Sequence, residues 1–275
     1  MMKKPIFTEF LKIIIDTFFI PFKKNKTFLS YLFNHTLHKE LEERIENGGI
    51  FPLYHIHRSI RLAKQFPDQN FIILDIGGGI GASALLYNKF FPENKIIVFE
   101  PILDNYNIIK SKISHFSNIE VFNYAVGSEN SKKQINIANR ITSSSLFPLS
   151  VDPDSTVFNE KNLGQNRVEN IEVVRLDDFL TRIPDDIGII KIDVQGYEMN
   201  VLKGAEASLK RAKIVLLEAN NHDGYVGSPK YFTIDNYLRE HHFTLYDILP
   251  SIFDKGKLKE WDVIYLRNSA ICALV

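Results

Sequence analysis

The chain has 275 residues, of which 45% are apolar, so it can bury the core of one large domain and carry a smaller appendage. Its 33 Lys and Arg balance its 33 Asp and Glu, and no basic stripe with interleaved aromatic residues occurs, which argues against a nucleic-acid substrate. The single cysteine, Cys272, cannot form a disulfide within the chain, and no Cys-x-x-Cys pair is present. A cytoplasmic location with a buried Cys272 is therefore the simplest expectation.

The first segment, residues 5–22, is rich in large apolar side chains but is interrupted by Glu9, Lys12 and Asp16. It is too short and too charged to span a bilayer, and no small-residue cleavage site of a signal peptide follows it. One interpretation is an interfacial helix that docks on anionic lipid through its flanking lysines, near a lipid-linked glycan. The other is a helix packed on the core. Liposome flotation with and without this segment distinguishes the two. The flanking lysines are Lys3, Lys4, Lys23, Lys24 and Lys26.

Residues 30–66 are mostly polar, and their pattern predicts two helices separated by Gly48-Gly49 and Pro52. The sequence thus divides into a helical appendage, residues 1–66, and a main domain, residues 67–275. Tyr54, His55 and His57 precede the main domain. Three interpretations of this group are open: surface or core side chains, residues that cover a cofactor, or a His-x-His metal pair on a strand.

The main domain opens with FIILDIGGGIGAS, residues 71–83. The apolar run before Asp75 is typical of a strand buried on both faces, and Gly77, Gly79 and Gly81 form a turn through which the backbone can approach a ligand closely. A helix is expected from Ala82. Strand, turn and helix in this order open a doubly wound α/β sheet, whose ligands bind beyond the carboxyl ends of the strands.

The cofactor at this turn, residues 77–81, is suggested by two acids. Gly77, Gly79 and Ala82 also fit the dinucleotide pattern, so an NAD-dependent oxidoreductase is one alternative. Glu100 ends the second apolar strand, residues 95–100, where a carboxylate accepts ribose hydroxyls in either class. Asp75 favours S-adenosylmethionine, because a carboxylate beneath the turn repels a pyrophosphate but attracts the methionine ammonium and sulfonium.

Further strands and helices alternate along the chain. Their order predicts a mostly parallel seven-stranded sheet that ends in an antiparallel hairpin and gathers Asp75, Glu100, Ala125 and Asp193 at one cleft. The expected strands are residues 119–126, 187–194, 213–219, 243–249 and 261–267, and the expected helices are residues 102–116 and 198–210.

A long insertion, residues 127–186, separates the third and fourth predicted strands. It contains the serine cluster Ser143, Ser144 and Ser145. Long loops in compact domains are commonly functional, so these hydroxyls are candidates for cofactor or acceptor binding. A solvated turn is the alternative.

The separated motifs, in order, are FEPILDNY, NYAVG, LDDFL and IKIDVQGYEMNVLKGAE, which begin at residues 99, 123, 176 and 190. In these motifs the chain resembles FkbM-family methyltransferases over roughly residues 70–220. The resemblance implies a class I, Rossmann-like methyltransferase fold and S-adenosylmethionine as cofactor. Gly78-Gly79 stands where the family has Ala-Asn, which should leave cofactor binding intact, and Gln195 stands where Glu is usual, which puts a catalytic role there in doubt. The predicted cofactor-binding residues are Asp75, Gly77, Gly79, Gly81, Glu100, Pro101, Ala125, Val126, Ser144 and Asp193.

The expected reaction is O-methylation, for which the enzyme aligns the substrates, excludes water and removes a proton late. Asp193, Glu218 and His222 are the candidate catalytic residues. Asp193 is the first candidate for the base, although it could instead cap a helix. A minority alternative gives the same three residues to Mg²⁺.

The resemblance implies a small-molecule acceptor, a hydroxyl of a sugar, glycolipid or secondary metabolite. A catalytically inactive, membrane-associated glycan-binding protein is the non-enzymatic alternative. The sequence does not predict the oligomeric state.

Overall fold

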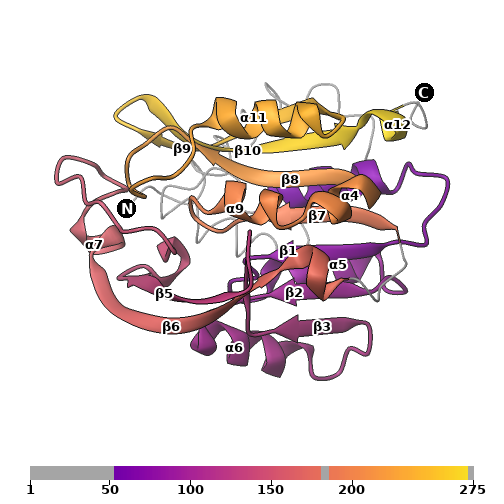
Figure 1. Ribbon diagram of the computed structural model, residues 1–275, viewed down its shortest axis with the longest axis horizontal. Coiled ribbons are helices and arrows are strands. Elements are labelled where there is room, and N and C mark those ends of the chain that lie inside the picture. Colours follow the sequence, from indigo (N-terminus) through magenta and orange to yellow (C-terminus); the bar gives the residue numbers. More distant parts are fainter. Residues whose placement is uncertain (1–52, 181–185, 272–275) are drawn as a thin grey trace, which may run out of the picture. The chain divides into compact units, whose positions relative to one another are not determined.

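The computed structural model describes residues 53–180 and 186–271 (Figure 1). The predictions for residues 1–52, including the segment 5–22 and the break at Gly48-Gly49, and the burial of Cys272 lie outside these ranges. None of the helices within them is both long and apolar enough to cross a membrane.

A seven-stranded sheet forms the centre of the domain, with the strand order β3-β2-β1-β7-β8-β10-β9. All neighbouring strands are parallel except around β10, which pairs antiparallel with β8 and β9. This confirms the predicted α/β class I methyltransferase architecture with its C-terminal hairpin. The strands are β1 (Ile72–Ile76), β2 (Ile96–Phe99), β3 (Ile119–Phe122), β7 (Ile187–Ile192), β8 (Ala212–Asn220), β9 (Phe243–Asp254) and β10 (Lys257–Arg267).

Helices cover both faces of this sheet. Side chains alternate between the faces along each strand, so the buried strands place apolar side chains on both faces, and each face needs a helical layer. Ile73 packs with α4 (Tyr54–Ala63), α5 (Ala82–Phe90) and α6 (Leu103–Ile113). Leu74 packs on the opposite face with α8 (Leu176–Phe179), α9 (Glu198–Lys203), α10 (Glu206–Arg211) and α11 (Tyr231–Glu240). A short helix, α12 (Asn268–Ile271), follows β10. The central strands are apolar on both faces, as parallel strands between helical layers require.

Helix α4 belongs with the sheet, since Ile56 and Ile60 are buried in the same core as the strands. The compact unit that contains the sheet starts at Leu53. The boundary between residues 66 and 67 remains a prediction, but the helix before it packs as part of the main domain.

The third predicted strand, residues 119–126, is wrong in its second half. β3 ends at Phe122, and the side chain of Asn123 donates to the carbonyl oxygens of Glu100 and Pro101, at 3.0 and 2.8 Å, where the chain leaves the sheet. The next residues form β4 (Ala125–Gly127) in a second sheet, of order β4-β6-β5.

The insertion therefore contains strands and short helices and is not a loop throughout. It contributes β5 (Ser131–Ala138), η2 (Ile141–Ser143), α7 (Glu160–Leu163) and β6 (Gln165–Arg175). The predicted helix 198–210 also differs, because it is split into α9 and α10 around Gly204. A Cβ on Gly204 would lie 1.9 Å from the Gly127 carbonyl oxygen, so only glycine permits this contact between helix and insertion.

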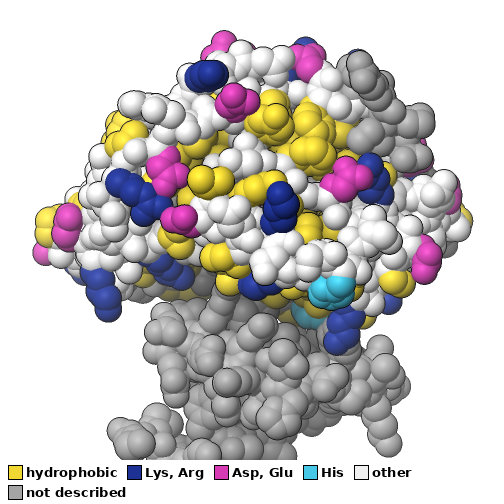
Figure 2. All heavy atoms as spheres, turned by 90° about the horizontal axis from the view of Figure 1, so that it is seen from below, with side chains coloured by type: hydrophobic (Ala, Val, Ile, Leu, Met, Phe, Trp, Pro, Cys, Tyr) yellow, Lys and Arg dark blue, Asp and Glu magenta, His cyan; other side chains and the backbone are white. Residues whose placement is uncertain are grey.

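Figure 2 shows the side of the domain that carries β3 and α6. Acidic and basic side chains are interspersed with apolar ones on this side, and no wide area carries charges of one sign. Leu103 and Ile108 of α6 are exposed apolar residues. The balanced composition of the chain is thus visible as a mixed surface on this face.

Candidate active site

The glycine turn follows β1 and leads directly into α5. Gly77, Gly79 and Gly81 have φ values of 81°, 55° and 85°, which L side chains rarely adopt. A Cβ on Gly77 would lie 1.9 Å from the Asp193 carbonyl oxygen, whereas a Cβ on Gly79 would meet no atom within 4 Å. At Gly77 the turn therefore packs closely against the backbone of Asp193, which follows β7. At Gly79 there is free space, where a ligand can approach the backbone.

Asp75 lies at the end of β1 and is fully buried. Its carboxylate forms an ion pair with Lys191 Nζ at 3.0 Å and accepts a hydrogen bond from the Ser83 hydroxyl. Parallel pairing of β1 with β7 places Lys191 beside Asp75 in register. The negative charge that we expected to face the cofactor is thus compensated by the protein itself.

Lys191 connects Asp75 to the rest of the site. Its ammonium also donates to the Gly77 carbonyl oxygen at 3.0 Å and lies 3.5 Å from Asp193 Oδ2. Burial alone would lower the pKa of Lys191, but the carboxylates of Asp75 and Asp193 more than offset it and raise that pKa above its ordinary value. Sequence reasoning missed this residue, although a lysine within a strand otherwise apolar is a signal for a buried charge.

Glu100 follows β2 and faces the turn. Its carboxylate accepts hydrogen bonds from the backbone N–H groups of Gly79 and Ile102, at 2.8 and 3.0 Å. Burial raises the pKa of Glu100 to about 7 despite these bonds. Pro101, half-buried, comes next and is joined to Asn123. Glu100 is thus beside the glycine turn, as predicted.

The remaining predicted cofactor residues lie in or near the second sheet. Ala125 packs with the apolar residues of that sheet, and Val126 packs in the core below the first. The Ser144 hydroxyl donates to the Ile141 carbonyl oxygen at 2.7 Å and accepts from the Ala138 N–H at 3.1 Å, so it stabilises its own turn. Cofactor contacts of these three residues remain predictions.

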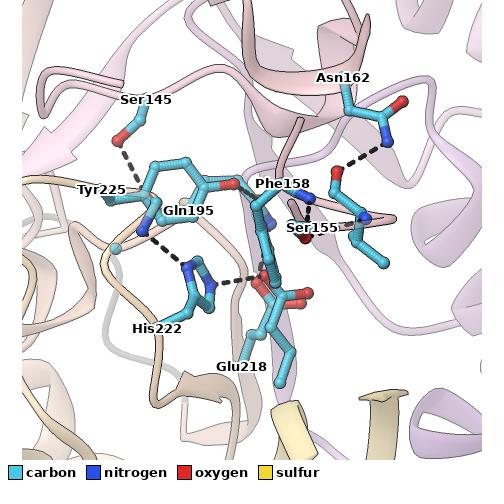
Figure 3. A network of polar contacts seen from close by, with 12 residues as sticks. Ser145, Ser155, Phe158, Asn162, Gln195, Glu218, His222 and Tyr225 are labelled. Carbon is cyan, nitrogen blue, oxygen red and sulfur yellow. Dashed lines mark hydrogen bonds and ion pairs between the residues drawn. The ribbon is translucent and has the colours of Figure 1, made fainter. Parts of the chain in front are cut away.

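Asp193 and Glu218, here called the carboxylate pair, lie near the ends of β7 and β8 and are joined by one amide. Gln195 Nε2 donates to Asp193 Oδ1 at 2.9 Å and to Glu218 Oε2 at 2.8 Å. Figure 3 shows Gln195, Tyr225 and Glu218 within one network of polar contacts. Burial and the neighbouring Glu260 and Asp193 raise the pKa of Glu218 well above its ordinary value. Two of the three predicted catalytic residues therefore meet.

His222 belongs to the same network but has both ring nitrogens occupied. Its Nε2 lies 2.9 Å from Glu260 Oε1, and its Nδ1 accepts from the Gly224 N–H at 2.9 Å. Phe158 stacks on the ring at 3.9 Å between centroids. A catalytic role for His222 remains a prediction, but as a proton acceptor it would first have to give up one of these bonds.

The metal alternatives are not supported. Within residues 53–180 and 186–271, no group of three or more His, Cys, Asp or Glu side chains is placed to hold an ion. The predicted His-x-His pair lies on helix α4, and not on a strand. His55 forms an ion pair with Asp262 at 3.1 Å, and His57 is buried against Phe90. His55 and His57 thus have contacts within the protein, and a role for this group in covering the cofactor remains a prediction.

The model for the Methyltransferase FkbM domain matches residues 75–245, which include the glycine turn, the insertion and the carboxylate pair. The chain belongs to the FkbM methyltransferase family. Its cofactor is S-adenosylmethionine, as in the rest of the family.

Two curated methyltransferases are similar to this FkbM-family chain. Methyltransferase 1 of Beauveria bassiana is 26% identical over 168 residues, which are 55% of this chain and 66% of that protein. The 2-O-methyltransferase NoeI of Sinorhizobium fredii is 24% identical over 225 residues, or 78% and 86% of the two chains. The match thus spans slightly less than two thirds of the Beauveria protein.

A solved FkbM methyltransferase from Methylobacillus flagellatus is 17% identical, with a TM-score of 0.45 over 72% of this chain and 44% of that one.

Glu198, in the motif that begins at residue 190, is fully buried at the start of α9. Its Oε1 accepts from the Gly196 N–H at 3.0 Å, and its Oε2 has no hydrogen-bond partner within the described parts of the chain. Burial raises the pKa of Glu198 to about 7. A carboxyl of this kind is neutral at mildly acidic pH, where an ordinary glutamate is already ionised, and this avoids a buried charge there.

The raised pKa of Glu198 makes stability depend on pH. The neutral form stabilises the fold fully below the unfolded pKa of about 4.5, and this contribution is lost as pH rises through about 7. We expect Glu198→Gln to remove about 2 to 3 kcal/mol of the fall in unfolding free energy between pH 5 and pH 8. Urea unfolding at both pH values measures it. The exposed Glu93→Gln is the control, and a pH dependence that is equal in all three proteins would contradict the assignment.

Proposed function

We propose that this chain transfers the methyl group of S-adenosylmethionine to a hydroxyl group of a sugar, glycolipid or secondary metabolite. The observation that carries the proposal is the carboxylate pair, bridged by Gln195, beside the glycine turn. Two carboxylates held close together by one amide suit removal of a hydroxyl proton. The name of NoeI, a 2-O-methyltransferase, agrees with this class of acceptor.

The residues of the turn fit the cofactor. Free space at Gly79 admits a ligand to the backbone, and Glu100 offers carboxylate oxygens for the ribose hydroxyls once it releases the N–H groups that it now binds. Asp75 acts through Lys191 in this proposal. The ion pair of these two residues holds the Gly77 carbonyl group, which we expect to face the methionine part of the cofactor. When bound, the cofactor supplies a methyl group made electrophilic by its sulfonium.

The carboxylate pair has the properties of a proton acceptor. The Asp193 side chain is 40% exposed, so an acceptor hydroxyl can reach it from solvent. Glu218 is more enclosed, and its raised pKa means that it holds a proton more tightly than an ordinary glutamate does. In this proposal the pair would take the hydroxyl proton while the oxygen replaces sulfur on the methyl carbon, so that the methyl–sulfur bond breaks and neutral S-adenosylhomocysteine is left. Gln195 keeps both carboxylates in place. His222, with both nitrogens engaged, supports Glu260.

Glu100 gives the cofactor site a pH dependence. Affinity for S-adenosylhomocysteine is expected to rise with pH through about 7, because the ionised carboxylate accepts hydrogen bonds better than the neutral form. Glu100→Gln should weaken binding about 10- to 100-fold at pH 8 and flatten this profile. Isothermal titration calorimetry measures both effects. Glu120→Gln, which removes an exposed carboxylate from the neighbouring strand, is the matched control, and equal affinities would contradict the ribose role.

The reaction itself is tested by intact-mass analysis. The full chain is incubated with S-adenosylmethionine and candidate glycans, glycolipids and hydroxylated metabolites, and each acceptor is examined for the mass gain of one methyl group. Methylation at a hydroxyl supports the proposal. Methylation only at nitrogen would overturn it, as would calorimetry that shows NAD binding and no binding of S-adenosylhomocysteine. Docking of residues 5–22 on anionic lipid, near a lipid-linked acceptor, is part of the proposal and rests on sequence alone.

A further inference from the structure

Gln195 occupies a constrained position in the turn between β7 and α9. Its backbone has φ 53°, a left-handed conformation that non-glycine residues seldom adopt, and Gly196 follows with φ 96°. Such strain persists only where surrounding contacts fix it. One of these contacts is the Ser145 hydroxyl, which donates to the Gln195 carbonyl oxygen at 2.6 Å from the insertion.

The side-chain amide of Gln195 can work in only one orientation. Its Nε2 carries the two hydrogens that bridge Asp193 and Glu218. If the amide were reversed, its oxygen would face two carboxylates and no donor would lie between them. The choice between the two orientations therefore depends on what the amide oxygen binds.

That oxygen accepts a hydrogen bond from the Tyr225 hydroxyl. Tyr225 is 2% exposed, and burial together with the nearby carboxylates of Glu260 and Glu218 raises its pKa well above the ordinary value, so it stays neutral and keeps its donor. A phenol that donates to the oxygen forces the nitrogen of the amide toward the carboxylate pair.

Tyr225 is itself held by the insertion. The backbone N–H of Val226 donates to the Pro148 carbonyl oxygen and that of Ser150 to the Gly224 carbonyl oxygen, both at 2.9 Å. The loop that carries Tyr225 is thus paired to the same segment that supplies Ser145. Figure 3 shows Ser145, Tyr225 and Gln195 converging from these different parts of the chain.

We propose that Tyr225 is a positioning residue for methyl transfer: its hydroxyl sets the Gln195 amide so that Asp193 and Glu218 are held as one proton-accepting pair. The proposal rests on the proposed function for the role of the pair, but the positioning itself is carried by geometry. The N–H donors of Gln195 stabilise the ionised form of the carboxylate pair. They therefore counteract the effect of burial, which raises the pKa of a carboxyl group. The charged groups that face Glu218 are Asp193, which follows β7, Glu198 from α9, and Glu260 and Asp262 from β10.

The test compares Tyr225→Phe with Tyr231→Phe, which removes a hydroxyl that contacts Tyr265 instead. Tyr225→Phe is expected to lower kcat about 10- to 100-fold with KM for S-adenosylmethionine unchanged, because only the acceptor side loses its alignment. Tyr231→Phe should behave as wild type. In a Gln195→Leu background, Tyr225→Phe should have no further effect on kcat, since the amide that it orients is gone. An additive effect would overturn the proposal.

A second readout needs no acceptor. In protein labelled with ¹³C at glutamate carboxyl groups, the Glu218 signal is identified by its loss in Glu218→Gln and is titrated by NMR. We expect Tyr225→Phe to raise the pKa of Glu218 relative to wild type and Tyr231→Phe to leave it unchanged. Unchanged titration in Tyr225→Phe would overturn the positioning role. If the titration shifts but no hydroxyl acceptor is ever methylated, O-methylation fails while the positioning of the pair stands.

Discussion

Replacing Gly77 with alanine is expected to destabilise the fold by about 3 to 5 kcal/mol and to abolish measurable binding of S-adenosylhomocysteine. The added Cβ would lie 1.9 Å from the Asp193 carbonyl oxygen, and the φ of 81° is itself strained for alanine. Relief requires the turn to move away from the end of β7. Urea unfolding monitored by circular dichroism gives the stability, and isothermal titration calorimetry gives the affinity.

Gly79→Ala is the matched control for this substitution. The residue also has a positive φ, 55°, but a Cβ there meets no protein atom within 4 Å. We expect a loss of only about 1 kcal/mol from backbone strain. Weakened cofactor binding in Gly79→Ala with near-normal stability would show that the free space belongs to the ligand. A Gly77→Ala protein as stable as Gly79→Ala would contradict the close contact between the turn and β7.

Replacing Lys191 with methionine should destabilise the protein by about 3 to 5 kcal/mol, because it leaves the fully buried Asp75 carboxylate without its cation. Methionine keeps much of the volume of the lysine stem, so the loss reports on charge more than on packing. The free energy of unfolding from urea denaturation at pH 7 measures it. Lys213→Met, which changes a lysine on the neighbouring strand β8 that pairs with the half-exposed Asp186, should cost far less.

The double variant Asp75→Asn with Lys191→Met separates an unpaired charge from a general disturbance. Removing both charges is expected to recover much of the stability lost in Lys191→Met, because no buried ion then lacks a partner. A double variant less stable than either single change would mean that the two residues contribute independently. In that case Asp75 and Lys191 would not form the unit that supports the glycine turn.

The central sheet was predictable because its strands are long apolar runs separated by clear helical and turn signals. Phe71 to Ile76 is apolar apart from Asp75, and glycines at 77, 79 and 81 mark the turn whatever the rest of the chain does. The second sheet was not predictable in the same way. Its strand β6, Gln165–Arg175, is largely exposed and polar, so its pattern resembles that of a loop until its pairing with β5 is known.

The candidate site was predictable only for residues whose place in the fold follows from their own sequence context. Asp75, Glu100 and Asp193 end apolar strands, so topology brings them to one edge of the sheet. Lys191 carried a signal of burial, as a lysine within an apolar strand, but its partners did not follow from it. The contacts of Gln195 and Tyr225 were not predictable, because their roles depend on partners far along the chain. Gln195 meets Glu218 across 23 residues and Tyr225 across 30, and the sequence contains no local rule for either contact.

The pairing of the insertion with the loop around Tyr225 constrains any attempt to redesign acceptor choice. Grafting the insertion of another enzyme onto this chain would replace the serine that binds the Gln195 carbonyl and the segment that seats Tyr225. A chimera that changes residues 127–186 alone would lose these contacts, and we expect it to have a lower kcat because the support of Gln195 and Tyr225 is gone. Transplanting residues 222–228 along with the insertion would move the two hydrogen-bonded segments as one unit and keep them matched to each other.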